Sequence, residues 1–215
     1  MRILVFDTET TGLPEGKNPS IFDTDKWPHV IQLSWIVYDT VAGDYTELED
    51  SLIRTPVPPS PDSERIHGIT HSMAKRTGVP IDTALTSFDI ALRSCDIVVG
   101  HNVSFDKRML MVESIRLGRR LGFSTDKGRK QEHCTMKNNV RFCAIEVIGE
   151  NGDKYLKYPR LNELYRKLFK SEAVNAHNAM ADVIMCLRCY CFKEYGVDVT
   201  KRGKVGKMFK LYCGQ

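Results

Sequence analysis

The chain has 215 residues, of which 42% are apolar and 27% are charged. This composition is typical of one globular domain with a sizeable core, and no apolar stretch approaches the roughly 18 residues of a membrane span. Seven cysteines, an odd count, argue against a complete disulfide framework. With no leader pattern at the start, the sequence predicts a protein of the cytoplasm, or of the nucleus in a eukaryote, that is neither secreted nor membrane-bound.

Basic charge is concentrated at the end of the chain. The whole net charge of +4 is carried by residues 197–215, which contain five basic residues and one acid. Residues 1–196 are therefore neutral overall. We expect a single domain over residues 1–196, followed by a basic C-terminal tail over residues 197–215 that binds phosphates, docks on a partner protein or is solvated.

The first third of the chain is predicted to form an antiparallel meander. Three segments are rich in apolar, β-branched and aromatic residues, and a Gly-Asp turn joins the last two. The predicted strands are residues 2–9, 30–40 and 45–54. Four prolines in residues 55–61 predict an irregular connection, and residues 66–70 are expected to form a turn before a small helix that ends at Ala74.

Helices dominate the remainder of the chain. Apolar residues recur at helical spacing in four segments. The predicted helices are residues 81–94, 104–121, 161–169 and 179–194. A short apolar strand is expected at residues 96–100, a polar loop at 122–133, and a β-hairpin at 145–158, around an Asn-Gly turn. This order predicts an α/β fold: a mixed β-sheet, antiparallel in its first three strands, flanked by helices.

Two carboxylates follow the first predicted strand. Successive side chains of a strand point to opposite faces, so Asp7 and Glu9 share one face at its carboxyl end. Two carboxylates this close repel, and each raises the pKa of the other unless a cation lies between them. A divalent ion such as Mg2+ or Mn2+ suits such oxygen ligands. The alternative is a strand end with two solvated acids.

Two further acids stand near predicted helix starts. Asp106 follows the short strand at residues 96–100, and Asp182 lies five residues after His177. Taken singly, each acid also fits an ordinary helix N-terminus, where negative charge suits the helix dipole. His177 and Asp182 would be about 140° apart on one helix, so they meet at one site only if His177 lies in the preceding loop. That position, with an unperturbed pKa of about 6.5, suits proton transfer better than metal ligation.

Together these sites carry a family resemblance. The chain resembles the DnaQ-like 3′–5′ exonucleases of the DEDDh type, which have a ribonuclease H-like fold. The matching segments are Phe6-Asp7-Thr8-Glu9-Thr10-Thr11-Gly12-Leu13, His101-Asn102-Val103-Ser104-Phe105-Asp106, His177 with Asp182, Ile66-His67-Gly68-Ile69-Thr70 and Leu161-Asn162-Glu163-Leu164-Tyr165. The resemblance spans residues 1 to about 195 and includes all five signature residues.

The resemblance implies a catalytic site with two divalent metal ions, Mg2+ or Mn2+. The four implied ligands are Asp7, Glu9, Asp106 and Asp182. Asp7 would bridge both ions, Glu9 and Asp182 would complete one site, and Asp106 would act through water. Two such ions stabilise the attacking and leaving oxygens of an in-line phosphoryl displacement, and His177 would take the proton of the attacking water.

The resemblance also implies a binding site for the 3′-terminal nucleotide. The implied substrate-binding residues are Thr10, Thr11, Gly12, Leu13, His67, Asn102 and Phe105. The threonines would meet the 3′-OH and the sugar, and Leu13 would wedge against the terminal base. Two of these residues also have a structural interpretation: His67 as a turn residue and Phe105 as a core aromatic.

The leading interpretation is a metal-dependent exonuclease that removes nucleoside 5′-monophosphates from the 3′ ends of single-stranded or frayed DNA, in proofreading or trimming. RNA 3′-end trimming is an alternative, because discrimination between the sugars depends on pocket shape. A non-catalytic, polymerase-associated nucleic-acid-binding module is another, but loss of an acid would mark it and none is lost. The expected partners are single-stranded nucleic acid 3′ ends, with a polymerase or another replication protein as a further candidate.

Overall fold

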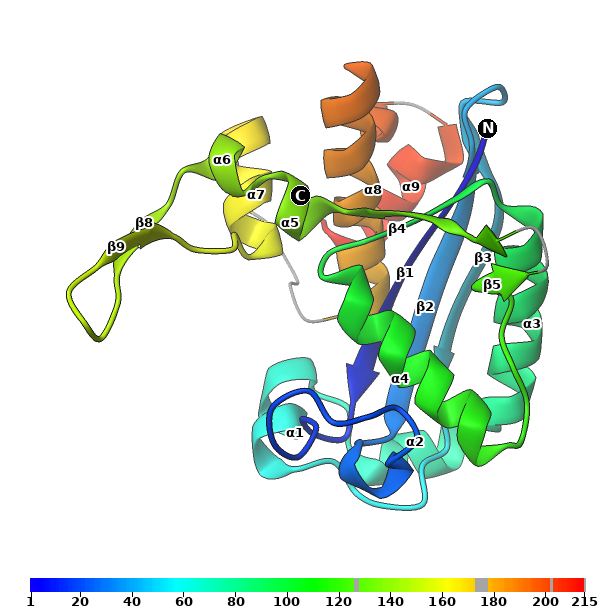
Figure 1. The fold of residues 1–215 in the computed structure, drawn as a ribbon. Coiled ribbons are helices and arrows are strands. Elements are labelled where there is room, and N and C mark those ends of the chain that lie inside the picture. Colours follow the sequence, from blue (N-terminus) through cyan, green and yellow to red (C-terminus); the bar gives the residue numbers. More distant parts are fainter. Residues whose placement is uncertain (126–127, 173–177, 202, 215) are drawn as a thin grey trace.

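A mixed five-stranded sheet forms the centre of the protein. A computed structural model describes residues 1–215 except 126–127, 173–177, 202 and 215. From one edge to the other, its strands are β3 (Asp44–Leu52), β2 (Val30–Asp39), β1 (Arg2–Thr10), β4 (Ile97–Gly100) and β7 (Gln131–Cys134). The first three strands are antiparallel, whereas β4 runs parallel to β1 and β7 parallel to β4. This is the mixed α/β sheet predicted from the sequence (Figure 1).

The central strand β1 is covered by helices on both faces (Figure 1). Its side chains alternate: Ile3 and Val5 join one buried apolar cluster, and Leu4 and Phe6 join another. The helices that complete these clusters are α8 (Ala179–Tyr195) on the first face and α3 (Ile81–Ser94) and α4 (Val103–Arg116) on the second. All four side chains are at most 1% exposed, so the end of β1 is fixed in position.

The remaining elements surround this core. They are η1 (Thr24–Lys26), α1 (Pro61–His67), α2 (His71–Thr77), β5 (Ser124–Thr125), β6 (Gly128–Arg129), α5 (Thr135–Asn138), α6 (Val140–Cys143), β8 (Glu146–Ile148), β9 (Lys154–Leu156), α7 (Leu161–Phe169), η2 (Val199–Lys201) and α9 (Gly203–Tyr212). Strands β8 and β9 form the predicted hairpin, which projects away from the sheet (Figure 1). In the described part of the chain, every helix is too short or too polar to cross a membrane.

Helix α1 begins at the last residue of the expected irregular connection, residues 55–61, and extends into the expected turn at residues 66–70. It starts at Pro61, where the missing N–H of proline costs nothing because first-turn N–H groups have no partner within the helix. The Ser60 hydroxyl caps it by accepting a hydrogen bond from the Ser63 N–H. The turn begins only at Gly68, whose φ of 73° ends the helix. The four prolines therefore mark a helix start as well as an irregular connection.

A polar loop was expected at residues 122–133, but its last three residues belong to strand β7, which ends at Cys134. It is the outermost strand of the sheet beside β4. Gln131 and Glu132 are exposed and the next two residues are half-buried. An edge strand of this kind lacks the alternating apolar pattern on which a prediction from sequence depends.

The described part of the expected basic tail folds back onto the domain. Val205 and Cys213 belong to the same buried cluster as Ile3 and Val5. The Asp44 carboxylate at the start of β3 accepts hydrogen bonds from the N–H groups at the start of α9, from Lys204 at 2.7 Å and from Val205 at 3.2 Å. Residues of this segment thus complete the core on the α8 side of the sheet.

Arg188 on α8 joins three helices at this interface. Its guanidinium donates to the Asp198 carboxylate at 3.0 and 2.8 Å, and it stacks against the rings of Tyr165, Phe169 and Phe209, on α7 and α9, with centroid distances of 5.2, 3.9 and 4.9 Å. Only 14% of the Arg188 side chain and 8% of the Asp198 side chain are exposed. The pair holds the pKa of Asp198 below its usual value through these hydrogen bonds, against the effect of burial.

We predict that Arg188→Met lowers the free energy of unfolding by about 3–5 kcal/mol, because it leaves the Asp198 carboxylate buried without its partner. Urea denaturation measures the change. The matched control is Arg65→Met, which breaks a pair whose side chains are 75% and 79% exposed and should cost at most about 1 kcal/mol. Equal effects of the two substitutions would contradict the prediction.

Candidate functional site

Three carboxylates meet where β1 and α8 come together. Asp7 and Glu9 lie at the end of β1, and Asp182 lies in the first turn of α8. One carboxylate oxygen from each lies within 4.8 Å of the other two. Among the described acids, histidines and cysteines, these three acids form a group that could hold a metal ion. The predicted convergence of these three residues is thus present in the structure.

Alternation along β1 explains this arrangement. Asp7 and Glu9 continue the row of Ile3 and Val5, so they project onto the face of the sheet that α8 covers. Asp182 faces them from α8, whose N-terminus is capped by Asn178: the side-chain carbonyl of Asn178 accepts a hydrogen bond from the Ala181 N–H at 3.2 Å. The capped start of α8 therefore fixes the position of Asp182.

Asp106 approaches from the other side of β1. It lies in the first turn of α4 and is only 3% exposed. One of its carboxylate oxygens accepts hydrogen bonds from the backbone N–H and the hydroxyl of Thr8, at 3.1 and 2.8 Å. Asp106 stands outside the group of three, and its expected action through water stays a prediction. Its charge is still close enough to raise the pKa of Asp7 and of Glu9.

The carboxylates hold protons more tightly than isolated acids do. Burial, followed by the charges of Asp106, Asp182 and Glu9, raises the pKa of Asp7 well above its usual value. Burial and the charges of Asp182 and Asp106 raise the pKa of Glu9 to about 8. Burial raises the pKa of Asp106 to about 7, against the hydrogen bonds from Thr8. Hard oxygen ligands that repel one another fit a divalent cation such as Mg2+ or Mn2+, whose charge removes the repulsion.

The start of α8 is also tied to the far edge of the sheet. The carboxamide oxygen of Gln32 on β2 accepts a hydrogen bond from the Ala179 N–H at 3.4 Å, and its nitrogen donates to the Asp50 carboxylate on β3 at 2.8 Å. The hydroxyl of Tyr212 on α9 donates to the other Asp50 oxygen at 3.0 Å. Residues from β2, β3 and α9 thus support the helix that carries Asp182.

The predicted proton acceptor, His177, lies outside the described residues. The structure describes the chain again from Asn178, and α8 begins at Ala179. The role of His177 stays a prediction.

The two threonines after Glu9 are buried and hydrogen-bonded within the protein. The Thr10 hydroxyl donates to the Gly12 carbonyl at 2.7 Å. The Thr11 hydroxyl accepts from the His29 N–H at 2.9 Å, and the Thr11 N–H donates to the His29 carbonyl at 2.8 Å. These bonds fix the Thr-Thr-Gly turn, and the predicted contacts of the threonines with a 3′-terminal sugar stay predictions.

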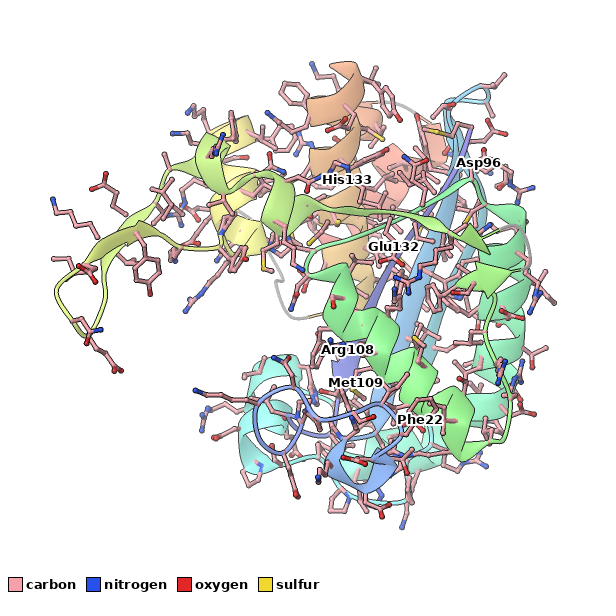
Figure 2. The ribbon with its side chains drawn as sticks, viewed as in Figure 1. Phe22, Asp96, Arg108, Met109, Glu132 and His133 are labelled. Atoms are coloured by element: carbon pink, nitrogen blue, oxygen red, sulfur yellow. The ribbon has the colours of Figure 1, made fainter. Side chains whose placement is uncertain are left out.

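Leu13, Asn102 and Phe105 line one hollow of about 360 Å3, together with Trp27 and Arg108. Leu13 is 82% exposed although it is apolar. Asn102 precedes α4 in the left-handed conformation, with φ of 68°, and so directs the chain from β4 into the helix. Figure 2 shows Arg108 projecting from α4 near the loop that carries Phe22. The structure therefore brings three of the predicted nucleotide-binding residues together in one hollow.

His67 lies at the end of α1 and turns back towards Thr10. Its Nδ1 accepts a hydrogen bond from the Ile69 N–H at 3.0 Å, which places the proton of the neutral ring on Nε2. That nitrogen is buried, and no described residue forms a hydrogen bond with it. Burial lowers the pKa of the ring, and the nearby Thr10 backbone opposes this effect. The predicted contact of His67 with a 3′-terminal nucleotide stays a prediction.

A supporting cluster that the sequence did not reveal holds the Thr-Thr-Gly turn. One Glu113 oxygen on α4 lies 3.1 Å from His29 Nδ1, accepts from the Val30 N–H at 3.0 Å and pairs with Arg116 at 3.0 Å. Burial would raise the pKa of Glu113, but the hydrogen bond with His29, the Arg116 charge and the Val30 N–H together lower it. His29 in turn binds Thr11. No local pattern connects residues more than 80 positions apart, so this cluster becomes visible only in three dimensions.

Comparisons with known proteins place this geometry in context. A family of exonucleases (RNase_T) matches residues 4–190. E. coli exonuclease I in complex with a dA16 oligonucleotide has a similar structure, with a TM-score of 0.64 and 20% identity over 91% of this chain and 41% of that one. The zinc-bound form of its complex with single-stranded DNA has a TM-score of 0.66 and 20% identity, and the match covers 91% of this chain and 41% of that one. The chain spans about two fifths of exonuclease I, and no curated protein sequence matches it. The structural likeness confirms the predicted ribonuclease H-like fold.

We predict that the metal-free protein loses stability as the pH rises from about 5 to about 8. The pKa values of Glu9 and Asp106 are raised to about 8 and about 7 in the folded state, from usual values of 4.5 and 3.8. Between these limits the folded state binds more protons than the unfolded state, so the free energy of unfolding falls with increasing pH. Thermal unfolding in chelator across this pH range measures the effect.

Added Mn2+ should raise the unfolding temperature most at the upper end of this range, where the carboxylates are ionised. Glu9→Gln should flatten both the pH dependence and the response to Mn2+. An unfolding temperature that rises through this pH window without metal would contradict the assignment.

Proposed function

Because this chain belongs to the exonuclease family, we propose that it is a metal-dependent 3′–5′ exonuclease of the DEDDh type. It removes nucleoside 5′-monophosphates from the 3′ ends of single-stranded or frayed DNA. The observation that carries this proposal is the convergence of Asp7, Glu9 and Asp182 within 4.8 Å, with Asp106 on the opposite side of β1. A non-catalytic module would have no need to keep four mutually repelling acids together.

In the proposed mechanism, the carboxylates hold two divalent ions, Mg2+ or Mn2+. Asp7, central among the four acids, would contribute to both sites, Glu9 and Asp182 would complete one, and Asp106 would contribute through water. Bound there, the ions supply the positive charge that stabilises the attacking and leaving oxygens of an in-line phosphoryl displacement. The hydrogen bonds from Thr8 hold Asp106 in place for this task.

The residues of the chain also handle the proton and the substrate. We assign His177 as the general base, because the family resemblance places the proton-accepting histidine at this position, five residues before Asp182, and imidazole is the most common general base in enzymes. Thr10, Thr11 and Gly12 would receive the 3′-terminal sugar, and the exposed Leu13 would contact the terminal base.

The nucleotide pocket in this proposal is the hollow between the Thr-Thr-Gly loop and α4. Asn102 and Phe105 line it, and His67 at the end of α1 would contact the bound nucleotide as the family resemblance implies. Exonuclease I has been solved with dA16 and dT13 oligonucleotides, which supports single-stranded DNA as the first substrate to test. A role in replication or repair, with a polymerase or another replication protein as partner, is part of the same proposal.

Asp7→Ala should lower the rate of nucleoside monophosphate release in Mn2+ by about 1000-fold or more. The substitution removes the carboxylate shared by both proposed metal sites, and with it several kcal/mol of transition-state stabilisation. The protein should stay folded, since the substitution removes a charge that is repelled in the metal-free state. Chromatography of the released nucleotides measures the activity. Asp25→Ala, at an exposed acid, is the matched control and should leave it unchanged. A wild-type protein that releases no monophosphate from any 3′ end would refute the proposed function.

Matched DNA and RNA oligonucleotides labelled at the 5′ end distinguish the substrates. In Mg2+ or Mn2+, a 3′–5′ enzyme should give a ladder of labelled products that shortens with time, and the proposal expects faster shortening of the DNA strand. Early release of labelled mononucleotide would indicate attack from the 5′ end and would contradict the polarity. Faster digestion of RNA would assign the chain to 3′-end trimming of RNA.

A further inference from the structure

The hairpin and the segment that follows it have an unusual sequence. Residues 154–160 read Lys-Tyr-Leu-Lys-Tyr-Pro-Arg, with three cations, two tyrosines and no acid. They form β9 and the connection from β9 to α7. Tyr155 and Tyr158 are 55% and 58% exposed, which is high for side chains of their size. Aromatic rings alternating with cations are typical of surfaces that bind single-stranded nucleic acid.

This segment leads directly to the carboxylates. Tyr158 and Arg160 line a hollow of about 380 Å3 that Asp182 also lines. Asn102 lines this hollow as well as the one that contains Leu13 and Phe105. The two hollows therefore lie on either side of the start of α4. A strand whose 3′ end occupies the first hollow would pass the carboxylates and enter the second.

Hydrogen bonds hold the wall of the second hollow in place. His101, which is part of this wall, lies 3.0 Å from the Thr135 hydroxyl and 3.0 Å from the Pro159 carbonyl. Because Pro159 lies between Tyr158 and Arg160, these contacts fix the segment that carries both residues.

The ring of Tyr155 is supported from below. A β-carbon at Gly149 would lie 3.4 Å from a carbon of that ring, so the ring rests over the glycine backbone. In the hairpin register Tyr155 pairs with Val147, whereas Ile148 pairs with Lys154. Successive residues point to opposite faces, and Tyr155 and Ile148 therefore lie on opposite faces of the hairpin. One face carries a supported, exposed aromatic ring, and the other provides a control position.

We propose that Tyr155, Tyr158 and Arg160 form an accessory binding track for single-stranded nucleic acid upstream of the 3′-terminal nucleotide. This inference rests on the proposed function and adds to it the path of the substrate. The three residue steps from Tyr155 to Tyr158 span about 10 Å of extended backbone. Only a strand that continues well beyond its 3′ end can reach Tyr155, so the track makes the enzyme prefer longer strands.

The test compares a DNA trinucleotide with a dodecanucleotide. For each, kcat/KM is measured from the monophosphate released, and the ratio of the two values reports the length preference. In the double variant Tyr155→Ala with Tyr158→Ala, the preference for the dodecanucleotide should fall about 10- to 100-fold, because base stacking on each ring is lost. The conservative double variant with Phe at both positions keeps the rings and should keep the preference. Ile148→Ala, on the opposite face, should also keep it.

Three results would overturn the track. The length preference could survive the double alanine variant, it could fall equally in Ile148→Ala, or the double variant could change the sedimentation coefficient of the protein alone without changing the preference. The last result would mean that the hairpin binds a second copy of the chain.

Calorimetric titration with the dodecanucleotide in chelator separates this inference from the proposed function. If the wild type cleaves nothing but binds the dodecanucleotide more tightly than the double alanine variant, the track stands and the exonuclease assignment fails. If the wild type cleaves and both proteins bind equally, the assignment stands and the track fails.

Discussion

Repulsion among partly buried carboxylates is the constraint on which this structure depends. One oxygen each of Asp7, Glu9 and Asp182 lie within 4.8 Å of one another, and burial together with the neighbouring negative charges raises the pKa of both β1 acids. A chain pays for such a cluster in stability unless a cation neutralises it. The surrounding fold is therefore organised to hold the acids together: β1 is buried at the centre of the sheet, α8 is capped, and Thr8 fixes Asp106.

The sequence predicted those parts of the site that short-range rules determine. Asp7 and Glu9 share a face because strands have a period of two, and the strong apolar patterns of β1, β2, α3 and α8 identified the core elements. Family membership confirmed the DnaQ-like resemblance, as the matched residues 4–190 include the first two motifs and Asp182. The convergence of β1 with α8 itself followed from the resemblance, because no spacing in the sequence encodes it.

The features that were missed depend on tertiary context. β7 is an exposed edge strand with polar residues, and α1 begins inside a proline-rich stretch, so neither shows its usual pattern. The bond between His29 and Glu113 joins positions more than 80 residues apart. The segment 197–215 looked like a basic tail because its charges are conspicuous, whereas the few buried side chains that attach it, Val205 and Cys213, are easily overlooked in the sequence.

The hydrogen bonds that run from Tyr212 through Asp50 and Gln32 to the Ala179 N–H have a consequence for where the functional unit ends. The family match stops at residue 190, and the pattern of charge suggested a boundary at 196. Either boundary would separate Tyr212 from the residues to which these hydrogen bonds connect it. A metal ion bound by Asp182, as proposed, would therefore be thermodynamically linked to the docking of α9: whatever stabilises one would favour the other. In energetic terms the unit that holds Asp182 in place includes α9, and a ligand that pulled α9 away would weaken the proposed metal site without touching it.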